Sequence, residues 1–198
     1  KHETRITVTQ TQADAKLGIP LFAFPLPLEI TTAERTFTVT LAIEEARHVV
    51  LLPMDAPATR VRVDPTSTAL FELDWDPGAP AWQAQLTQPD DVRGRILAAH
   101  ALVKTGHPRD TQAVVSAFEA EPFWGVRCEW ADALGDAQTE AALSGLLSLA
   151  ATHRDPLSLA ALLRQLGRYR DARIVPCLTA RLAEGLPPRA HEAALDAL

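Results

Sequence analysis

The sequence has little of several features that would identify a chemistry or a membrane location. Its two cysteines, Cys128 and Cys177, show no CxxC spacing, so we interpret both as small apolar core residues and not as a disulfide or a metal site. No uninterrupted run of about 18 apolar residues occurs, which predicts that no segment crosses a membrane. The first residues show no signal-peptide pattern, and the chain starts at Lys1 without an initiating Met. We therefore expect a piece of a longer protein.

The sequence also lacks an excess of positive charge. It has 19 Lys and Arg residues against 25 Asp and Glu residues, which gives a net charge of −6. Phosphate backbones and anionic lipid do not attract a negative chain, so we expect no nucleic-acid partner and no membrane partner. A hydrophobic content of 47% is ordinary for a globular domain. With few cysteines, both expected to be reduced, the composition favours the cytoplasm, although a mature secreted fragment would also lack a signal peptide.

Motifs of common active sites are missing as well. The patterns GxSxG, P-loop and GxGxxG do not occur. His191 and Glu192 resemble the start of HExxH, in which two histidines one helical turn apart bind zinc. Leu195 stands where the second histidine is needed, so we interpret His191 as a partly covered residue of the last helix.

Three further pairs of ionisable residues lie close in the sequence: His100 and His107, Glu44 and Glu45, and Asp74 and Asp76. We expect a helix end to separate the first pair, solvent to surround the second at a strand end, and the third to form a turn. None of them has the arrangement of a shared metal site or a catalytic pair. The sequence therefore predicts no catalytic, metal-binding or cofactor-binding residue in this chain.

A repeat of 32 residues dominates the second half of the chain. The interval separates two series of apolar residues: Leu102, Leu134, Leu166 and Leu198, and Val114, Leu146 and Leu178. Each series lies in its own helical pattern, so one period holds two helices, which bury their apolar faces by stacking on neighbouring pairs. We predict hairpins over 90–121, 122–153 and 154–185 plus the opening helix of a fourth. This is a HEAT-like α-solenoid of about three and a half hairpins.

The first helix of this stack also shows start and stop signals. Asp90 or Asp91 can cap it, and Gly106 stands where a left-handed residue ends a helix. We expect its buried stripe to contain four apolar residues: Val92, Ile96, Ala99 and Val103. In the third hairpin, Pro176 fits the first turn of a helix that Asp171 caps.

The first third of the chain alternates apolar and polar residues, as half-buried strands do. We predict strands over 5–12, 28–31, 36–43, 49–52, 60–64 and 69–73. The segment Leu21–Pro27 contains three prolines, so we assign it an edge or connecting role. Six or seven short strands indicate a small antiparallel β-sandwich of immunoglobulin-like type.

The predicted fold is therefore α+β with several domains. We expect a β-sandwich domain over 1–74, a linker with a short helix over 75–89, and a helical repeat domain over 90–198. The segment 74–80 contains two prolines and a glycine, which stop both strands and helices.

Two groups of apolar residues are candidates for contact with other molecules. Phe123, Trp124 and Trp130 cluster after Pro122; we favour core packing, although exposure of Phe123 and Trp124 would mark a contact surface. His191, Leu195 and Leu198 form a stripe with no partner helix after it. We expect that stripe to pack backwards, to meet another chain, or to need a continuation of the stack.

Four segments resemble the C-terminal half of the aminopeptidase N family of zinc metallopeptidases. They are Gln10–Gln12, the stretch LFAFPLPLEI at 21–30, residues 55–65, and Trp82 with Gln85 and Leu86. In that family, a small β-sandwich follows the catalytic domain and a helical solenoid follows the sandwich. The family's HExxH helix, its third zinc-binding glutamate and its GxMxN strand have no counterpart in this sequence.

The resemblance implies a non-catalytic C-terminal region of a zinc-dependent aminopeptidase. In such a parent, the solenoid covers the catalytic cleft and restricts substrate length, while the sandwich acts as a spacer. The expected partners are the parent's catalytic domain, which would hold the zinc, and its peptide substrates. The alternative is a HEAT-repeat scaffold for protein–protein interaction, from a family member without catalysis.

Overall fold

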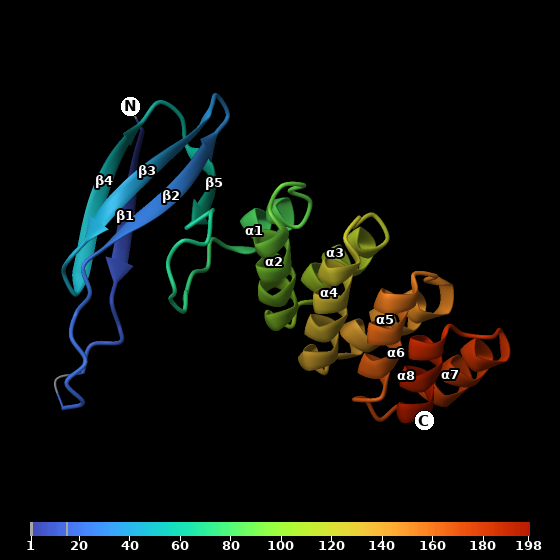
Figure 1. Cartoon of the computed structure of the whole chain (residues 1–198). Helices are drawn as coiled ribbons and strands as arrows, with labels where there is room; N and C mark the ends of the chain where they lie inside the picture. The colour runs from blue at the N-terminus through green and yellow to red at the C-terminus, as the bar shows by residue number, and fades with distance from the viewer. Residues whose placement is uncertain (1, 15) are drawn as a thin grey trace. The chain divides into compact units, whose positions relative to one another are not determined.

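A computed structural model describes residues 2–14 and 16–198 of the chain. The chain divides into two compact units, Lys1–Pro77 and Gly78–Leu198, which we describe separately (Figure 1). The first unit consists of strands and the second of helices.

The first unit is a sandwich of two antiparallel sheets. Its five strands are β1 (His2–Thr9), β2 (Phe24–Thr32), β3 (Thr36–Ile43), β4 (Arg47–Met54) and β5 (Ala58–Val63). One sheet pairs β1 with β4, and the other has the order β3-β2-β5. Alternate residues of both sheets form one apolar core, with Leu28 and Ile30 fully buried at its centre. The predicted sandwich is confirmed, and the described residues of this unit form five strands instead of the expected six or seven.

The expectation for Leu21–Pro27 was wrong in part, because Phe24–Pro27 belongs to β2, the middle strand of its sheet. Its prolines are tolerated because β5 pairs with β2 only from Leu28 onward. The carbonyl of Pro27 accepts a hydrogen bond from Asp64 N–H, so Pro27 turns its backbone toward the β5 side. On that side β5 has already ended, so no strand partner needs a hydrogen bond from the nitrogen of Pro27, which carries no hydrogen.

No strand forms over Ala69–Leu73, contrary to the prediction. The carboxylate of Asp64, which is 1% exposed, accepts hydrogen bonds from the Thr68 N–H and hydroxyl at 2.9 Å and from Ala69 N–H at 3.0 Å. These bonds hold the segment after β5 in a loop, because an aspartate that bonds to nearby backbone groups competes with strand pairing.

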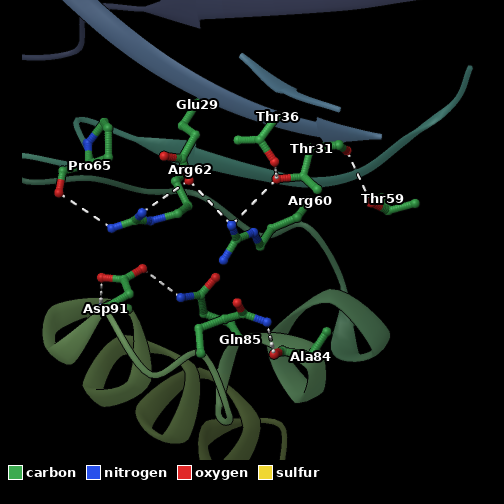
Figure 2. A network of polar contacts seen from close by, with 12 residues as sticks. Glu29, Thr31, Thr36, Thr59, Arg60, Arg62, Pro65, Ala84, Gln85 and Asp91 are labelled. Carbon is green, nitrogen blue, oxygen red and sulfur yellow. Dashed lines mark hydrogen bonds and ion pairs between the residues drawn. The ribbon is translucent and has the colours of Figure 1, made fainter. Parts of the chain in front are cut away.

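Three polar side chains line up across β2 and β5 on the outer face of the sheet (Figure 2). The Glu29 carboxylate accepts from Arg62 at 3.0 Å and from Arg60 at 3.3 Å. Glu29 and Arg62 are direct cross-strand partners, the arrangement in which opposite charges support a sheet.

The second unit contains eight helices. They are α1 (Ala79–Gln85), α2 (Val92–Lys104), α3 (Pro108–Phe118), α4 (Trp124–Ala137), α5 (Glu140–Thr152), α6 (Pro156–Leu166), α7 (Ile174–Ala183) and α8 (Pro188–Asp196). Figure 1 shows them in succession from green (α1) to red (α8). None of the helices in the described part of the chain has the length and apolarity that a bilayer crossing requires.

The helices stack in two rows, as the 32-residue repeat predicts. The even-numbered helices α2, α4, α6 and α8 pack in that order, and α3, α5 and α7 form the second row. Six of the seven repeating apolar residues are fully buried: Leu102, Leu134, Leu166, Val114, Leu146 and Leu178. The predicted α-solenoid of three hairpins and the opening helix of a fourth is therefore confirmed.

Aspartates cap two of the helices in the even-numbered row. Asp91 caps α2 by accepting from Gly94 N–H, and it also accepts from the Gln85 side chain at 2.6 Å (Figure 2). Asp155 caps α6 in the same way, two periods after Asp91. Gly106, with φ of 72°, follows α2 as predicted. Pro176 lies in the first turn of α7.

The predicted stripe of α2 holds for Ala99 and Val103, which are buried, and for Ile96, which is partly buried; it fails for Val92, which is 43% exposed. The buried face of α2 also includes Arg95, Ala98 and Leu102. The charge of Arg95 made this face look polar in the sequence. The structure buries it because its guanidinium pairs with Glu121 at 2.7 Å.

Candidate interaction surface

A groove runs over the outer faces of α4, α6 and α8. Its volume is about 400 Å³, and α6 lies between the other two helices in the row. The residues that line it recur with the 32-residue period, so it is a property of the repeat.

Small side chains form the floor of the groove. Ala160 and Ala161 of α6 line it and are 5% and 4% exposed. One period earlier, α4 carries Cys128 and Glu129 at the same two positions. The side chains of Ala160 and Ala161 end at Cβ, so they fill little of the space between α4 and α8.

The aromatic residues of α4 divide between the core and this surface. Trp130 is 1% exposed, and its indole N–H donates to the Arg95 carbonyl at 3.1 Å. Trp124, which lines the groove, is 46% exposed, and Phe123 is 43% exposed. Their rings meet edge to face with centroids 5.7 Å apart. Core packing, the favoured prediction, therefore holds for Trp130 and fails for the other two.

Charged residues surround the rest of the groove. Asp132, Arg164 and Asp196 occupy the same position in three successive periods and all line it. Asp132 accepts a hydrogen bond from the buried side chain of Gln165. Arg164 and Asp196 form no ion pair within the described residues. A charged partner can therefore pair with them without breaking an existing contact.

Cys128 also lines the groove but lacks the character of a nucleophile. Burial, followed by the nearby Asp132 carboxylate, raises the pKa of its thiol. A thiol must lose its proton to attack or to bind metal, so this environment disfavours both. Burial likewise raises the pKa of Cys177, and both cysteines are free.

The other residues marked in the sequence do not come together. Nε2 of His100 lies 3.8 Å from a Glu129 carboxylate oxygen on the neighbouring helix α4, while His107 is exposed at the start of α3. His191, the Glu44–Glu45 pair and the Asp74–Asp76 pair are all exposed. Across residues 2–14 and 16–198, no group of three or more His, Cys, Asp or Glu side chains could hold a metal ion.

One buried network was missed by the sequence analysis. His153 is 3% exposed, with Nδ1 3.0 Å from the Glu119 carboxylate and Nε2 2.7 Å from the Ser158 hydroxyl. This order of groups resembles a serine–histidine–acid triad. The Ser158 side chain, however, is fully buried. Its hydroxyl donates a hydrogen bond to the Asp155 carboxylate at 2.6 Å, because an ionised carboxylate can only accept one.

The network therefore joins helix ends, and its serine hydroxyl is not placed to attack a substrate. It connects the end of α3, the end of α5 and the start of α6, because Asp155 also accepts from Ser158 N–H. Burial would raise the pKa of the Asp155 carboxyl, but the two hydrogen bonds from Ser158 hold it below its usual value. The sequence signal was the Asp155–Ser158 spacing, which is typical of a helix start.

Comparison with known proteins agrees with the repeat. A family model of HEAT repeats matches residues 111–198. The helical part of the chain is HEAT-like. The match covers α4, α6 and α8, which form the groove, together with α5, α7 and most of α3. No curated protein matches the sequence.

Proposed function

We propose that the chain is a non-catalytic interaction module, whose groove over α4, α6 and α8 binds a protein partner. The groove carries the proposal, because it combines a half-exposed tryptophan with a floor of alanines and unpaired charges at its rim. Interface centres are enriched in Trp and Arg, and charges at the rim orient a partner. HEAT-like stacks offer extended surfaces of this kind.

A finer proposal concerns the molecule to which the module belongs. The segments that resemble the aminopeptidase N family support a parent zinc metallopeptidase, with the HEAT-like unit shaping access to its catalytic cleft. In the structure two of them have structural roles. The Gln10 side chain bridges the ends of the β1–β2 connection by bonding to the backbone of Phe22 at 2.8 and 2.9 Å. Asp64 organises the loop after β5.

The parent's catalytic domain would then be the partner, and peptides would be its substrates. Zinc would be held by that domain and not by residues 2–14 or 16–198. The alternative is a scaffold without a catalytic parent, and the HEAT-like repeats favour it. Two free cysteines fit a reducing compartment such as the cytoplasm.

One experiment separates these readings. The full-length product of the same gene and residues 1–198 alone are assayed for bound zinc and for hydrolysis of chromogenic amino-acid anilides. The peptidase proposal expects zinc and turnover in the full-length product only. If the full-length product has neither, the peptidase parent is rejected and the scaffold remains. Stoichiometric zinc or turnover in residues 1–198 would contradict both.

A further inference from the structure

The single proton of the Ser158 hydroxyl determines how His153 can bond. The hydroxyl oxygen lies 2.6 Å from Asp155 Oδ1 and 2.7 Å from His153 Nε2. Although burial acts in the opposite direction, the hydrogen bonds from Ser158 lower the pKa of the Asp155 carboxyl, so this carboxyl is ionised and can only accept. The hydroxyl therefore donates to Asp155 and has no second proton for His153.

Both ring nitrogens of His153 then act as donors. Nε2 must donate to the Ser158 oxygen, because the hydroxyl proton is already used. Nδ1 lies 3.0 and 3.2 Å from the two oxygens of the Glu119 carboxylate, which also only accepts. A histidine that donates from both nitrogens is the imidazolium ion. The observed contacts are therefore those of a positively charged ring.

A neutral ring cannot satisfy the same set of contacts. Without a hydrogen on Nε2, the Ser158 hydroxyl can turn and donate to that nitrogen. The hydroxyl oxygen and Asp155 Oδ1 would then face each other at 2.6 Å with no hydrogen between them. Asp155 would keep only the bond from Ser158 N–H at 3.0 Å. Loss of one proton from the ring thus weakens the start of α6.

Charged groups reach this site from every helix that packs against α5. They are Glu119 from α3, Arg127 from α4, Asp155 from α6 and Arg181 from α7. Glu119 bonds to the ring itself, and Asp155 bonds to the hydroxyl that the ring contacts. Arg181 reaches only the His153 carbonyl, at 3.1 Å, and its charge is paired with Glu184. The carboxylates therefore lie closest to the ring charge.

The preceding repeat has an ion pair at the equivalent place. Glu121 stands one period before His153, and Arg95 stands one period before Arg127. Nε of Arg95 donates to Glu121, whereas Nε of Arg127 is buried without a hydrogen-bond partner. The later repeat therefore has, in place of a carboxylate, a side chain whose charge changes near neutral pH.

We propose that His153, Ser158 and Asp155 form a proton-controlled latch between α5 and α6, with Glu119 fixing the ring to the end of α3. In the closed state, the imidazolium donates to Glu119 and Ser158, and Ser158 donates to Asp155. When the ring releases its Nε2 proton to water, the hydroxyl turns to Nε2 and its bond to Asp155 breaks. The stabilisation is present while the ring is protonated and is lost as the pH rises through its titration. This latch does not depend on the groove.

Two measurements on the 198-residue chain test the latch. Ring ¹⁵N NMR signals, identified as those of His153 by their loss in His153→Gln, show which nitrogen carries a proton at each pH. Hydrogen exchange of the Ser158 amide, which donates to Asp155, reports on the start of α6. We expect Nε2 to lose its proton while Nδ1 keeps its own. Over the same pH range, the protection factor of the Ser158 amide should fall about tenfold.

Two glutamates of similar exposure provide matched variants. Glu119→Gln removes the charge beside Nδ1 of His153, and Glu129→Gln removes the carboxylate beside His100; the two glutamate side chains are 55% and 50% exposed. Glu119→Gln should move both the loss of the Nε2 proton and the fall in protection to lower pH. Glu129→Gln should move neither.

Ser158→Ala removes the hydroxyl that turns, so the protection of the amide at residue 158 should no longer depend on the titration of His153. A Ser158 amide whose protection stays constant while His153 titrates would overturn the proposal. So would an Nε2 that carries no proton at any pH at which Asp155 is ionised. An equal fall at the Ala142 amide, which Thr139 caps, would also overturn it, because the loss would then belong to the whole fold.

Discussion

The Arg95 guanidinium binds both oxygens of the Glu121 carboxylate, at 2.7 and 3.1 Å, with the two side chains 4% and 1% exposed. The same guanidinium donates to the carbonyls of Gln88 and Pro89, and Glu121 accepts from Phe123 N–H. The pair therefore connects the loop before α2 with the turn before α4. It holds in place the turn that presents Phe123 and Trp124.

We predict that Glu121→Ala lowers the free energy of unfolding by about 3–5 kcal/mol, because it leaves the Arg95 charge buried without a partner. Denaturant titration followed by the helical circular dichroism signal measures this loss. Asp136→Ala is the control, since it removes the exposed ion pair with Arg168 and should cost about 0–1 kcal/mol. Equal losses for the two variants would contradict the role of the buried pair.

The sequence predicted the helical unit better than the strands. Leucines and valines at a fixed interval indicate helix pairs because stacking repeats the same burial in every period, and Leu134 and Leu146 follow that rule. Strand pairing depends on which strand lies alongside, and no local pattern states this. Pro25 and Pro27 therefore looked unsuitable for a middle strand until the short length of β5 was known.

The groove could be predicted only in part, for a similar reason. The aromatic pair Phe123 and Trp124 was visible, but the alanines of α6 have meaning only beside the larger residues of α4 and α8. The His153 network combines residues from three helix ends, and their proximity follows from the stacking of hairpins.

The second prediction concerns the contact between α3 and α5. A Cβ added at Gly145 would lie 2.5 Å from Cγ2 of Val115, so these helices approach closely only because residue 145 has no side chain. Gly145→Ala should lower the free energy of unfolding by about 1–3 kcal/mol, although alanine favours helices. Adding Val115→Ala should recover most of the loss. A single variant as stable as the native chain would show that the helices separate freely.

The third prediction is a pH dependence at the start of α6. Asp155→Ala should cost about 1 kcal/mol at pH 7, because it removes the cap that accepts from Ser158 N–H. The folded-state pKa of Asp155 is lowered, so its stabilisation is present above the unfolded-state pKa. It is lost as the pH falls through the lower folded-state pKa, and the difference between native and variant should shrink in acid.

Thr139→Ala is the matched control for this titration. Thr139 caps α5 by accepting from Ala142 N–H, and its hydroxyl does not ionise in this range. Its cost should stay constant between pH 7 and acid, as measured by denaturation at each pH. If the costs of both substitutions declined together as the pH fell, the effect would come from a loss of stability of the whole fold in acid and not from Asp155.

The fourth prediction distinguishes the two tryptophans of α4. Trp130→Ala should cost about 3–5 kcal/mol, because it opens a cavity in the core and removes the indole hydrogen bond to Arg95. Trp124→Ala should cost much less, since that side chain is 46% exposed. Thermal unfolding compares them. A large loss for Trp124→Ala would mean that the residue supports the fold and does not serve as a contact.

The most direct test of the account is a photo-crosslink from the groove. A photoreactive amino acid replaces Arg164 in the full-length gene product, in the cells that make it, and mass spectrometry maps the crosslinked peptides. A second protein carries it at Ser148, an exposed residue of α5 in the other row. We expect one discrete set of partner peptides from position 164, lost with Trp124→Ala, and none from position 148. Equal labelling from both positions, or none from position 164, would show that the groove does not bind a protein partner.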